Sequence, residues 1–354
     1  MTPQDASGLY ATWAGGDGKQ RKKEFNNHVA VDVSEVESIQ HFEFSGPDNS
    51  NNNEDEARVL VLTPMINDVT EETLAEYFKR LSELHYSHDR IDLGILVPAG
   101  EHHTSLRKAV RAAADALQAG KRGFRSVQLV TKSLDSDDDN RSGSGCRESY
   151  DAKARNYLVA ATLLPRHGYV FWHDVNLVDA PAMLIEDLMR ADADLVFPNT
   201  WDKAAVSEAS GRERGDYRAW TESPAGYKLA LGLPKDTVIP AGDRDRTHET
   251  GRTYLAAQGQ NVLAAIKAKE DKKNGGSNNK DDVNEQELHA QVPLDAVGTA
   301  ALLVRADVHR TGIIFPWFAF ENQCGSEGFG KMARRAGYRV VGLPNYVVYT
   351  EGGH

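Results

Sequence analysis

The stretch Tyr169-Val-Phe-Trp-His-Asp-Val-Asn-Leu-Val-Asp-Ala-Pro181 decides the fold. Its first four residues are aromatic or β-branched, and they predict a short buried strand. That strand ends at the polar residues His173, Asp174 and Asn176, and Pro181 is predicted to open a helix. In open α/β sheets, ligands bind beyond the carboxyl ends of the strands, so this tip is a candidate binding site.

The Asp-x-Asn tip has two chemical interpretations. Carboxylate and amide oxygens suit a hard divalent cation, and such a cation can bridge to a diphosphate. Alternatively, Asp174 and Asn176 cap the turn that follows the strand, as these residue types commonly do. The tripeptide by itself leaves both interpretations open.

Composition and charge narrow the class of protein. The chain has 354 residues, 40% of them hydrophobic and 26% charged, which is typical of a globular protein with a proper core. Its formal net charge of −11 argues against a nucleic-acid partner. The sequence contains no apolar run of about eighteen residues. We therefore expect either a cytosolic protein or the luminal part of a longer one. Cys146 and Cys324 form either one disulfide or two free thiols.

Strands and helices alternate along most of the chain, which predicts a mostly parallel sheet with helices on its faces. We expect residues 1–57 to form a flexible arm and residues 58–354 a single α/β domain, interrupted by a disordered insertion at about 268–285. The expected strands are Arg58–Thr63, Leu93–Pro98, Ser126–Thr131, Tyr169–Trp172, Asp194–Pro198, Ala300–Arg305, Arg339–Leu343 and Tyr346–Tyr349.

A helix expected over Arg147–Leu164 directly precedes the Tyr169 strand. It carries Ala154-Arg155-Asn156, in which a guanidinium stands among small neighbours. Arg155 can bind a phosphate through two parallel hydrogen bonds, or it can be an ordinary solvated surface arginine.

Several motifs occur in a characteristic order. Together they resemble the fungal Golgi mannosyltransferases of the mannan polymerase complexes, glycosyltransferase family 62. The similarity covers about Arg58 to the C-terminus. The motifs are Thr63-Pro-Met65, Ala154-Arg-Asn156, Trp172-His-Asp-Val-Asn176, Leu294-Asp-Ala-Val-Gly298, Phe315-Pro316, Ser326-Glu-Gly-Phe-Gly-Lys-Met-Ala333 and Gly342-Leu-Pro-Asn-Tyr-Val-Val-Tyr349.

This resemblance implies a GT-A-type nucleotide-diphospho-sugar transferase fold, with a mostly parallel central sheet flanked by helices. It implies transfer of mannose from GDP-mannose, with retention of the anomeric configuration, to an α-mannoside acceptor in N-glycan outer-chain synthesis. The linkage would be α-1,6 or α-1,2. It also implies Mn²⁺ as cofactor, luminal placement at the Golgi membrane, and homologous subunits as partners in a hetero-oligomer. The alternative is a catalytically weak or inactive scaffold subunit of such a complex.

The resemblance also suggests roles for particular residues around the donor. Thr63 and Pro64 would line the nucleoside pocket, and Arg155 would neutralise the diphosphate. Asp174 would hold the ribose or the metal. Asn176, which stands where the family has a second Asp, would be a metal ligand. The family has a His at the place of Thr350, and His354 is the candidate that replaces it as the third metal ligand.

On the acceptor side, the resemblance points to two acidic residues. Glu327 would orient the acceptor hydroxyl or steady the sugar, with Gly328 leaving room beside it, and Asp295 is the second acidic candidate. The alternative for Glu327 is an ordinary negative charge in the first turn of a helix.

Overall fold

A computed structural model of the chain describes residues 31–32, 38–43, 57–67, 69–120, 123–134, 146, 148–203, 215–239, 241, 250–258 and 285–351. The expected insertion at 268–285 lies almost entirely outside this part of the chain. The strands are β1 Val31–Asp32, β2 Ser38–Glu43, β3 Arg58–Pro64, β4 Ile91–Pro98, β5 Ser126–Lys132, β6 His167–His173, β7 Leu177–Asp179, β8 Leu195–Asp202, β9 Trp220–Thr221, β10 Thr253–Tyr254, β11 Val292–Pro293, β12 Ala301–Arg305 and β13 Val340–Thr350.

Eleven strands form one central sheet in the order β1-β2-β5-β4-β3-β6-β12-β8-β13-β11, with β7 paired to β13. The run β5-β4-β3-β6 is parallel, and β8 is parallel to β13. Strand β12 runs antiparallel between β6 and β8, so the sheet as a whole is mixed. Strands β9 and β10 form a separate two-stranded sheet.

The central strands are buried on both faces. In β3, Val59 and Val61 belong to one hydrophobic cluster, and Leu60 and Leu62 belong to the other. Successive side chains of a strand point to opposite faces, so a continuous apolar run is what two covered faces require. This is why the short apolar runs, and not alternating patterns, marked the strands in the sequence.

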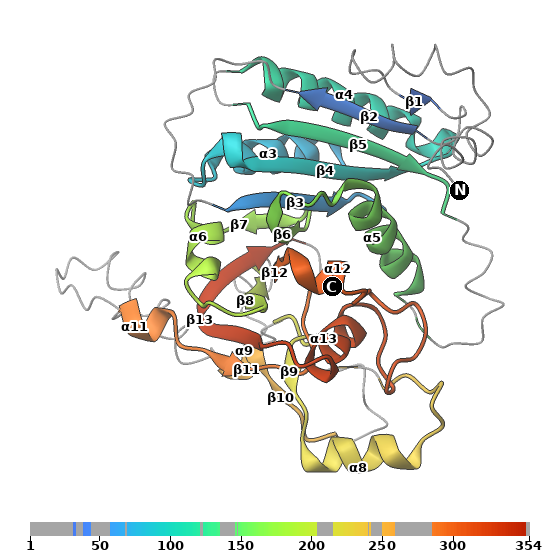
Figure 1. Cartoon of the computed structure of the whole chain (residues 1–354), viewed down its shortest axis with the longest axis vertical. Helices are drawn as coiled ribbons and strands as arrows, with labels where there is room; N and C mark the ends of the chain where they lie inside the picture. Colours follow the sequence, from blue (N-terminus) through green and yellow to red (C-terminus); the bar gives the residue numbers. More distant parts are fainter. Residues whose placement is uncertain are drawn as a thin grey trace, which may run out of the picture.

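Helices cover both faces of the sheet (Figure 1). The first cluster includes side chains of α3, α4 and α6, and the second includes side chains of α5, α12 and α13. The helices are α3 Glu71–Glu83, α4 Thr104–Ala119, α5 Ser149–Thr162, α6 Leu184–Met189, α8 Pro224–Gly232, α9 Leu255–Gln258, α11 Glu285–Leu288, α12 Ala306–Arg310 and α13 Gly325–Arg335, with short 3₁₀ turns at His88–Arg90 and Glu101–His103.

Most predicted strands are confirmed, but the structure differs in three places. The sheet begins before the predicted boundary at Arg58, because β2 pairs with β5. The helix expected from Pro181 begins only at Leu184, after a turn. The last two predicted strands are one strand, β13, whose pairing with β8 shifts register between Leu343 and Val347. None of the described helices is long and apolar enough to cross a membrane.

Candidate active site

The carboxyl ends of β3 and β6 lie side by side, because the two strands are parallel with Leu62 opposite Trp172. The hydroxyl of the buried Thr63 donates to the His173 carbonyl at 2.8 Å and accepts a hydrogen bond from the Tyr77 hydroxyl at 2.8 Å. Pro64 is buried as well. Thr63 therefore holds the backbone from which Asp174 follows, and the role of Thr63 and Pro64 in a nucleoside pocket stays a prediction.

His173 is the neutral neighbour of this tip. Burial lowers the pKa of His173 to about 4, against the opposing effect of its hydrogen bond to the Asp174 carbonyl. The ring also packs edge-on against Tyr77 and Phe171. At neutral pH, His173 therefore brings no positive charge to the carboxylate beside it.

Asp174 forms a turn immediately after β6. Its Oδ1 accepts a hydrogen bond from the Asn176 N–H at 2.9 Å, and its own N–H donates to the Ala300 carbonyl at 2.9 Å. The capping interpretation is thus confirmed for one carboxylate oxygen. Both Asp174 and Asn176 are only half-buried, so the remaining oxygens can still meet a ligand.

The donor set at this turn suits a shared cation better than a closed protein site. Within the described ranges, no three His, Cys, Asp or Glu side chains gather in a group that could hold a metal ion. Asp174 and Asn176 offer one carboxylate and one amide, which fits a cation that a ligand also binds through its own oxygens. His354 lies outside the described residues. The last described residue, Glu351, donates its N–H to the Asn176 carbonyl at 3.0 Å.

Arg155 projects from α5 over the end of β6. It is only 4% exposed, so it is not the solvated surface arginine of the alternative interpretation. Its Nε donates to Asp151 at 2.8 Å, and its guanidinium lies 5.3 Å from the Trp172 ring and 5.8 Å from the Phe315 ring. Its Nη1 is buried and has no hydrogen-bond partner among the described residues. A buried cationic donor without a partner is costly, so this group fits an anionic ligand.

Glu327 lies on the first turn of α13 and is 7% exposed. Its Oε1 accepts a hydrogen bond from Trp220 Nε1 at 2.6 Å. Burial, and then the nearby carboxyl of Glu148, raise the pKa of Glu327 to about 8, against the Trp220 hydrogen bond and the charges of Arg252 and Arg218. Near pH 7 this carboxyl is therefore mostly protonated, unlike an ordinary charge in a first helical turn.

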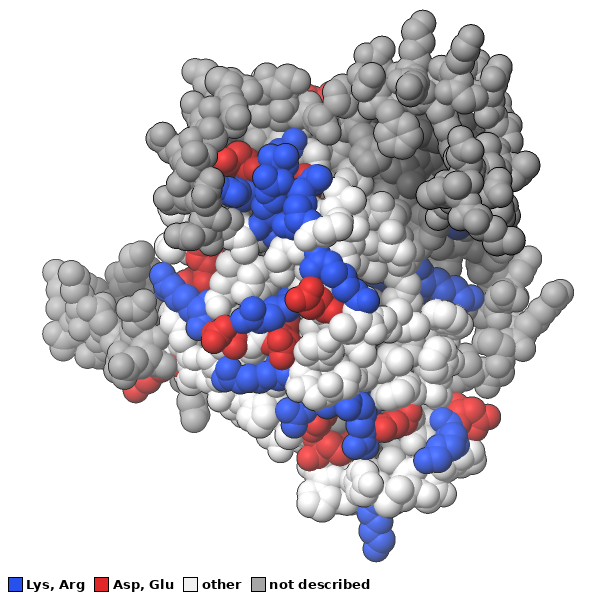
Figure 2. All heavy atoms as spheres, viewed as in Figure 1, with Lys and Arg blue, Asp and Glu red and all other residues white. Residues whose placement is uncertain are grey.

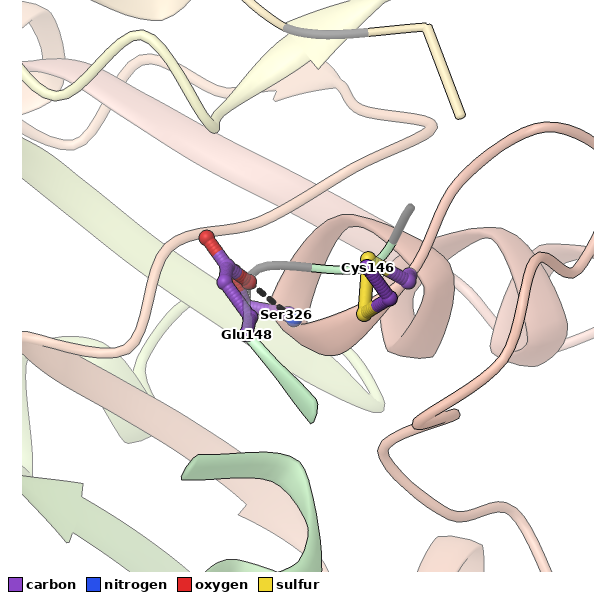
Figure 3. The surroundings of a disulfide bond; sticks show 4 residues. Cys146, Glu148 and Ser326 are labelled. Atoms are coloured by element: carbon purple, nitrogen blue, oxygen red, sulfur yellow. Dashed lines mark hydrogen bonds between the residues drawn. A yellow bond between two sulfur atoms is a disulfide. The ribbon is translucent and has the colours of Figure 1, made fainter. Parts of the chain in front are cut away.

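Glu148 caps the helix that carries Glu327. Its Oε2 accepts a hydrogen bond from the Ser326 N–H at 3.3 Å (Figure 3). A Cβ on Gly325, which has φ +56°, would lie 1.9 Å from that oxygen, so only glycine leaves space for the cap. A disulfide joins Cys146 to Cys324, with 6.0 Å between their Cα atoms. Cys146 lies two residues before Glu148, and Cys324 lies two residues before Ser326. The cysteines are thus paired, and the bond holds the start of α5 against the start of α13.

A second charged layer surrounds this pair of carboxyls. Arg218 donates two hydrogen bonds to the buried Asp216, from Nε at 2.9 Å and from Nη2 at 2.8 Å. Burial opposes the charge of Arg218, but Asp216 and then Glu148 hold its pKa above the usual range. A Cβ on Gly298 would lie 2.1 Å from Asp216 Oδ2. The glycine that ends the Leu294–Gly298 motif is therefore required by the close approach of Asp216.

The indole of Trp220 has a cation on its face. The guanidinium of Arg252 lies 3.7 Å from the Trp220 ring centroid, and it donates to both carboxylate oxygens of Glu222 at 3.1 and 3.3 Å. Lys331, one turn after Glu327, also contacts Glu222 at 3.4 Å. This chain of contacts fixes the indole and therefore the orientation of the Glu327 carboxyl.

The glycines after Glu327 serve packing. A Cβ on Gly328 would lie 2.4 Å from Pro316 Cγ, and one on Gly330 would lie 2.8 Å from Ala296 Cα. The expectation that Gly328 leaves room for an acceptor is therefore wrong, because Pro316 fills that space. Ser326 does not cap the helix with its side chain either, since α13 begins at Gly325 and Ser326 Oγ has no partner among the described residues.

Asp295 lies in a different environment from Glu327. Its Oδ2 accepts a hydrogen bond from the Glu222 N–H at 2.8 Å, and its Oδ1 lies 3.4 Å from Arg334 Nε. It lines a pocket between α8 and α13 to which Glu327 does not contribute. The two acidic candidates therefore do not act as one carboxylate pair.

Several residues of the site were missed from the sequence. No recognisable motif marks the segments that carry Glu148, Asp216, Arg218, Trp220 and Arg252. The cysteines were the one signal in the sequence that could have revealed Glu148. Glu148 lies two residues after Cys146 and Ser326 lies two residues after Cys324, so a disulfide between the cysteines brings Glu148 close to Ser326.

Comparison with known proteins identifies the family. The Anp1 family profile matches residues 38–319, which is most of the chain. The chain therefore belongs to the Anp1 family, and the resemblance to the mannan polymerase proteins is confirmed. The central sheet with helices on both faces confirms the predicted α/β fold class.

Its relatives are subunits of fungal mannan polymerase complexes. The chain is 31% identical to the mannan polymerase II complex anp1 subunit of Schizosaccharomyces pombe over 303 residues, which is 82% of this chain and 63% of the relative. It is 30% identical to the Saccharomyces cerevisiae ANP1 subunit, covering 54% of that protein, and 32% identical to the Candida albicans MNN9 subunit, covering 74%. The chain thus spans little more than half the length of the first two.

Two solved structures are similar at low sequence identity. The mannosyltransferase PcManGT from Pyrobaculum calidifontis, in complex with GDP-Man and Mn²⁺, is 14% identical, with a TM-score of 0.42 over 83% of this chain and 56% of that one. S. aureus TarS is 10% identical, with a TM-score of 0.40 over 83% of this chain and 60% of that one.

The surroundings of Glu327 predict opposite pKa shifts in two variants. Glu148→Gln removes a nearby negative charge and should lower the pKa of Glu327 from about 8. Trp220→Phe removes the indole donor that favours the carboxylate and should raise this pKa. Infrared spectroscopy of the protonated carboxyl C=O band against pH measures both shifts, with Glu327→Gln as the control that lacks the band. Shifts in the same direction, or no carboxyl that titrates near pH 8, would contradict the described environment.

Proposed function

We propose that this chain is the catalytic domain of an α-mannosyltransferase that uses GDP-mannose as donor and retains the anomeric configuration. The observation that carries the proposal is the buried guanidinium of Arg155, which has an unmet donor and stands over Trp172, two residues before Asp174. A cationic donor beside a half-buried carboxylate is suited to a diphosphate and its cation. Membership of a family whose relatives are mannan polymerase subunits supports mannose as the transferred sugar.

In this mechanism the donor diphosphate lies between α5 and the turn after β6. Arg155 binds the phosphate oxygens, and Asp174 and Asn176 would hold the divalent cation, for which we propose Mn²⁺. When bound, the cation neutralises charge that develops on the departing diphosphate. Arg155 adds to this stabilisation from a site that the Trp172 and Phe315 rings shield from water, where an electrostatic interaction is stronger. Thr63 keeps Asp174 in place through the His173 carbonyl.

The chemical step breaks the bond between the mannose anomeric carbon and the β-phosphate oxygen, and GDP departs with the electron pair. An acceptor hydroxyl forms the new glycosidic bond on the same face of the sugar, and its proton passes to the departing phosphate. Glu327 orients the reacting sugars as a neutral hydrogen-bonding group, because its raised pKa of about 8 keeps it protonated near pH 7. Trp220 holds its Oε1, so Oε2 is the oxygen that meets substrate.

The setting of the activity is part of the same proposal. We infer placement in the Golgi lumen, an α-mannoside acceptor of the N-glycan outer chain, and homologous subunits as partners in a hetero-oligomer. The names of the relatives as complex subunits support the hetero-oligomer. The linkage, α-1,6 or α-1,2, depends on the shape of the acceptor site.

One observation favours a second candidate, a weak or inactive scaffold subunit. Asn176 replaces a carboxylate at the metal turn, and no three-ligand cluster of His, Cys, Asp or Glu occurs within the described residues. Mannose transfer from GDP-mannose to α-mannobiose with Mn²⁺, tested with and without a partner subunit, separates the two candidates. Transfer supports the enzyme. No transfer in either setting supports the scaffold.

Arg155→Ala should weaken GDP binding by roughly 1.5–3 kcal/mol, the usual scale of a hydrogen bond to a charged group. Lys153→Ala on the same helix is the matched control, and it should leave GDP binding unchanged. Calorimetric titration with GDP measures both affinities, and circular dichroism establishes that both variants are folded. A folded Arg155→Ala protein with wild-type GDP affinity would remove Arg155 from the donor site.

Glu327→Ala should lower kcat by about 10²–10³-fold, the scale of one preorganised electrostatic group. Glu327→Gln keeps a neutral hydrogen-bonding group, so it should lose much less activity at pH 7. In the wild type, kcat should fall as the pH rises through about 8, because Glu327 loses its proton there. In Glu327→Gln, this fall should be absent. Equal inactivity of both variants at pH 7 would mean that the carboxylate, not the acid, is the active form.

A further inference from the structure

A pocket of about 400 Å³ lies between α8 and α13, away from the Asp174 turn. Its walls include Glu222 next to α8 and Asp295 between β11 and β12. Lys331, Arg334 and Arg335 of α13 also line it. Glu327 does not line this pocket, but Lys331 stands one turn after it on the same helix. The pocket therefore shares the α13 scaffold with the proposed catalytic carboxyl without being part of the donor site.

Each cation at this pocket is paired with a carboxylate. Lys331 lies 3.4 Å from Glu222, and Arg334 lies 3.4 Å from Asp295. Arg335 donates to both carboxylate oxygens of the neighbouring Glu321, at 2.6 and 2.9 Å. Acidic and basic side chains are interspersed on the lower part of the face in Figure 2. Because each of these cations is already held by a carboxylate, none of them is left free to bind a phosphate, and the pocket suits a neutral ligand.

The polar groups of the pocket are held in place before any ligand arrives. Glu222 is fixed by two hydrogen bonds from Arg252, and its N–H donates to Asp295 at 2.8 Å. A carboxylate has about four lone-pair positions, so Glu222 and Asp295 can each accept further hydrogen bonds. The paired Lys and Arg side chains likewise have further N–H groups that can donate to a ligand. Fixed donors and acceptors whose charges are already paired are what a polyhydroxylated ligand requires.

Two tyrosine rings complete the lining. Tyr227 on α8 is 53% exposed, an unusual position for a large aromatic side chain. Tyr338 follows α13, and its hydroxyl pairs with Thr311 at 2.8 Å. An amphipathic aromatic ring supplies an apolar face together with a polar tip. The C–H face of a pyranose is apolar and its rim carries hydroxyls, so a sugar matches both parts of this lining.

We propose that the pocket between α8 and α13 is a subsite for a neutral oligosaccharide, which binds acceptor sugar units remote from the one that reacts. The role of this subsite in catalysis rests on the proposed function, because the acceptor chain would have to extend from the pocket to Glu327. Its binding chemistry is independent of the donor. The volume of about 400 Å³ lies within the usual range of small-ligand sites and suits one or two sugar units.

The test uses linear α-linked mannotetraose and methyl α-mannoside as probes, titrated by NMR into the full chain without GDP-mannose. Wild-type protein should bind mannotetraose at least tenfold more tightly than the monosaccharide. Tyr227→Ala should weaken mannotetraose binding by roughly tenfold, the scale of one aromatic contact. Leu231→Ala is the matched control, because Leu231 is 64% exposed one turn further along α8 and does not line the pocket.

The kinetic consequence is a rise in KM for mannotetraose in Tyr227→Ala, with kcat and the KM for a monosaccharide acceptor unchanged. Equal binding of the two probes by the wild type, or wild-type mannotetraose affinity in Tyr227→Ala, would overturn the subsite. Tighter binding of mannose 6-phosphate than of methyl α-mannoside would overturn the assignment to a neutral ligand. Oligosaccharide binding in a protein that transfers no mannose would support the subsite while contradicting the catalytic proposal.

Discussion

The start of α13 is the constraint on which the rest of the site depends. The Cys146–Cys324 disulfide joins this helix end to the segment that leads into α5, and the Glu148 carboxylate accepts a hydrogen bond from the Ser326 N–H. A helix end has orphan N–H groups and a partial positive charge, so a buried carboxylate there stabilises both the helix and its own charge. Because α5 also carries Arg155, the same joint fixes the distance between the proposed diphosphate-binding arginine and Glu327.

Burial of two carboxyls at this joint has an electrostatic consequence. Burial raises the pKa of both Glu148 and Glu327, and the Glu148 carboxyl further raises the pKa of Glu327. Two ion pairs keep fixed charges around these carboxyls. Arg218 is paired with Asp216, and Arg252 is paired with Glu222. The result is that Glu327 is protonated near pH 7 within a set of fixed charges. Such an arrangement favours a hydrogen-bonding role for Glu327 over a role as a negative charge.

The parts of the fold predicted from sequence were those marked by local pattern. Apolar runs located β3, β4, β6 and β12. Arg155 and Asp174 became candidates because they belong to motifs on either side of a strand, and their roles stay predictions. Glu148, Arg218 and Arg252 could not be found, since their importance comes from contacts between segments far apart in the chain. Gly328 was misread for the same reason, because only the structure reveals that Pro316 occupies the space beside it.

The account centres on a donor site formed by Arg155 and the Asp174 turn. Its most direct test is a crystal structure of the chain soaked with GDP and Mn²⁺, with anomalous diffraction data collected to locate the manganese. The account predicts an anomalous peak within coordination distance of Asp174 and Asn176, and a diphosphate that accepts hydrogen bonds from Arg155. GDP bound elsewhere, or manganese bound away from the turn after β6, would contradict it.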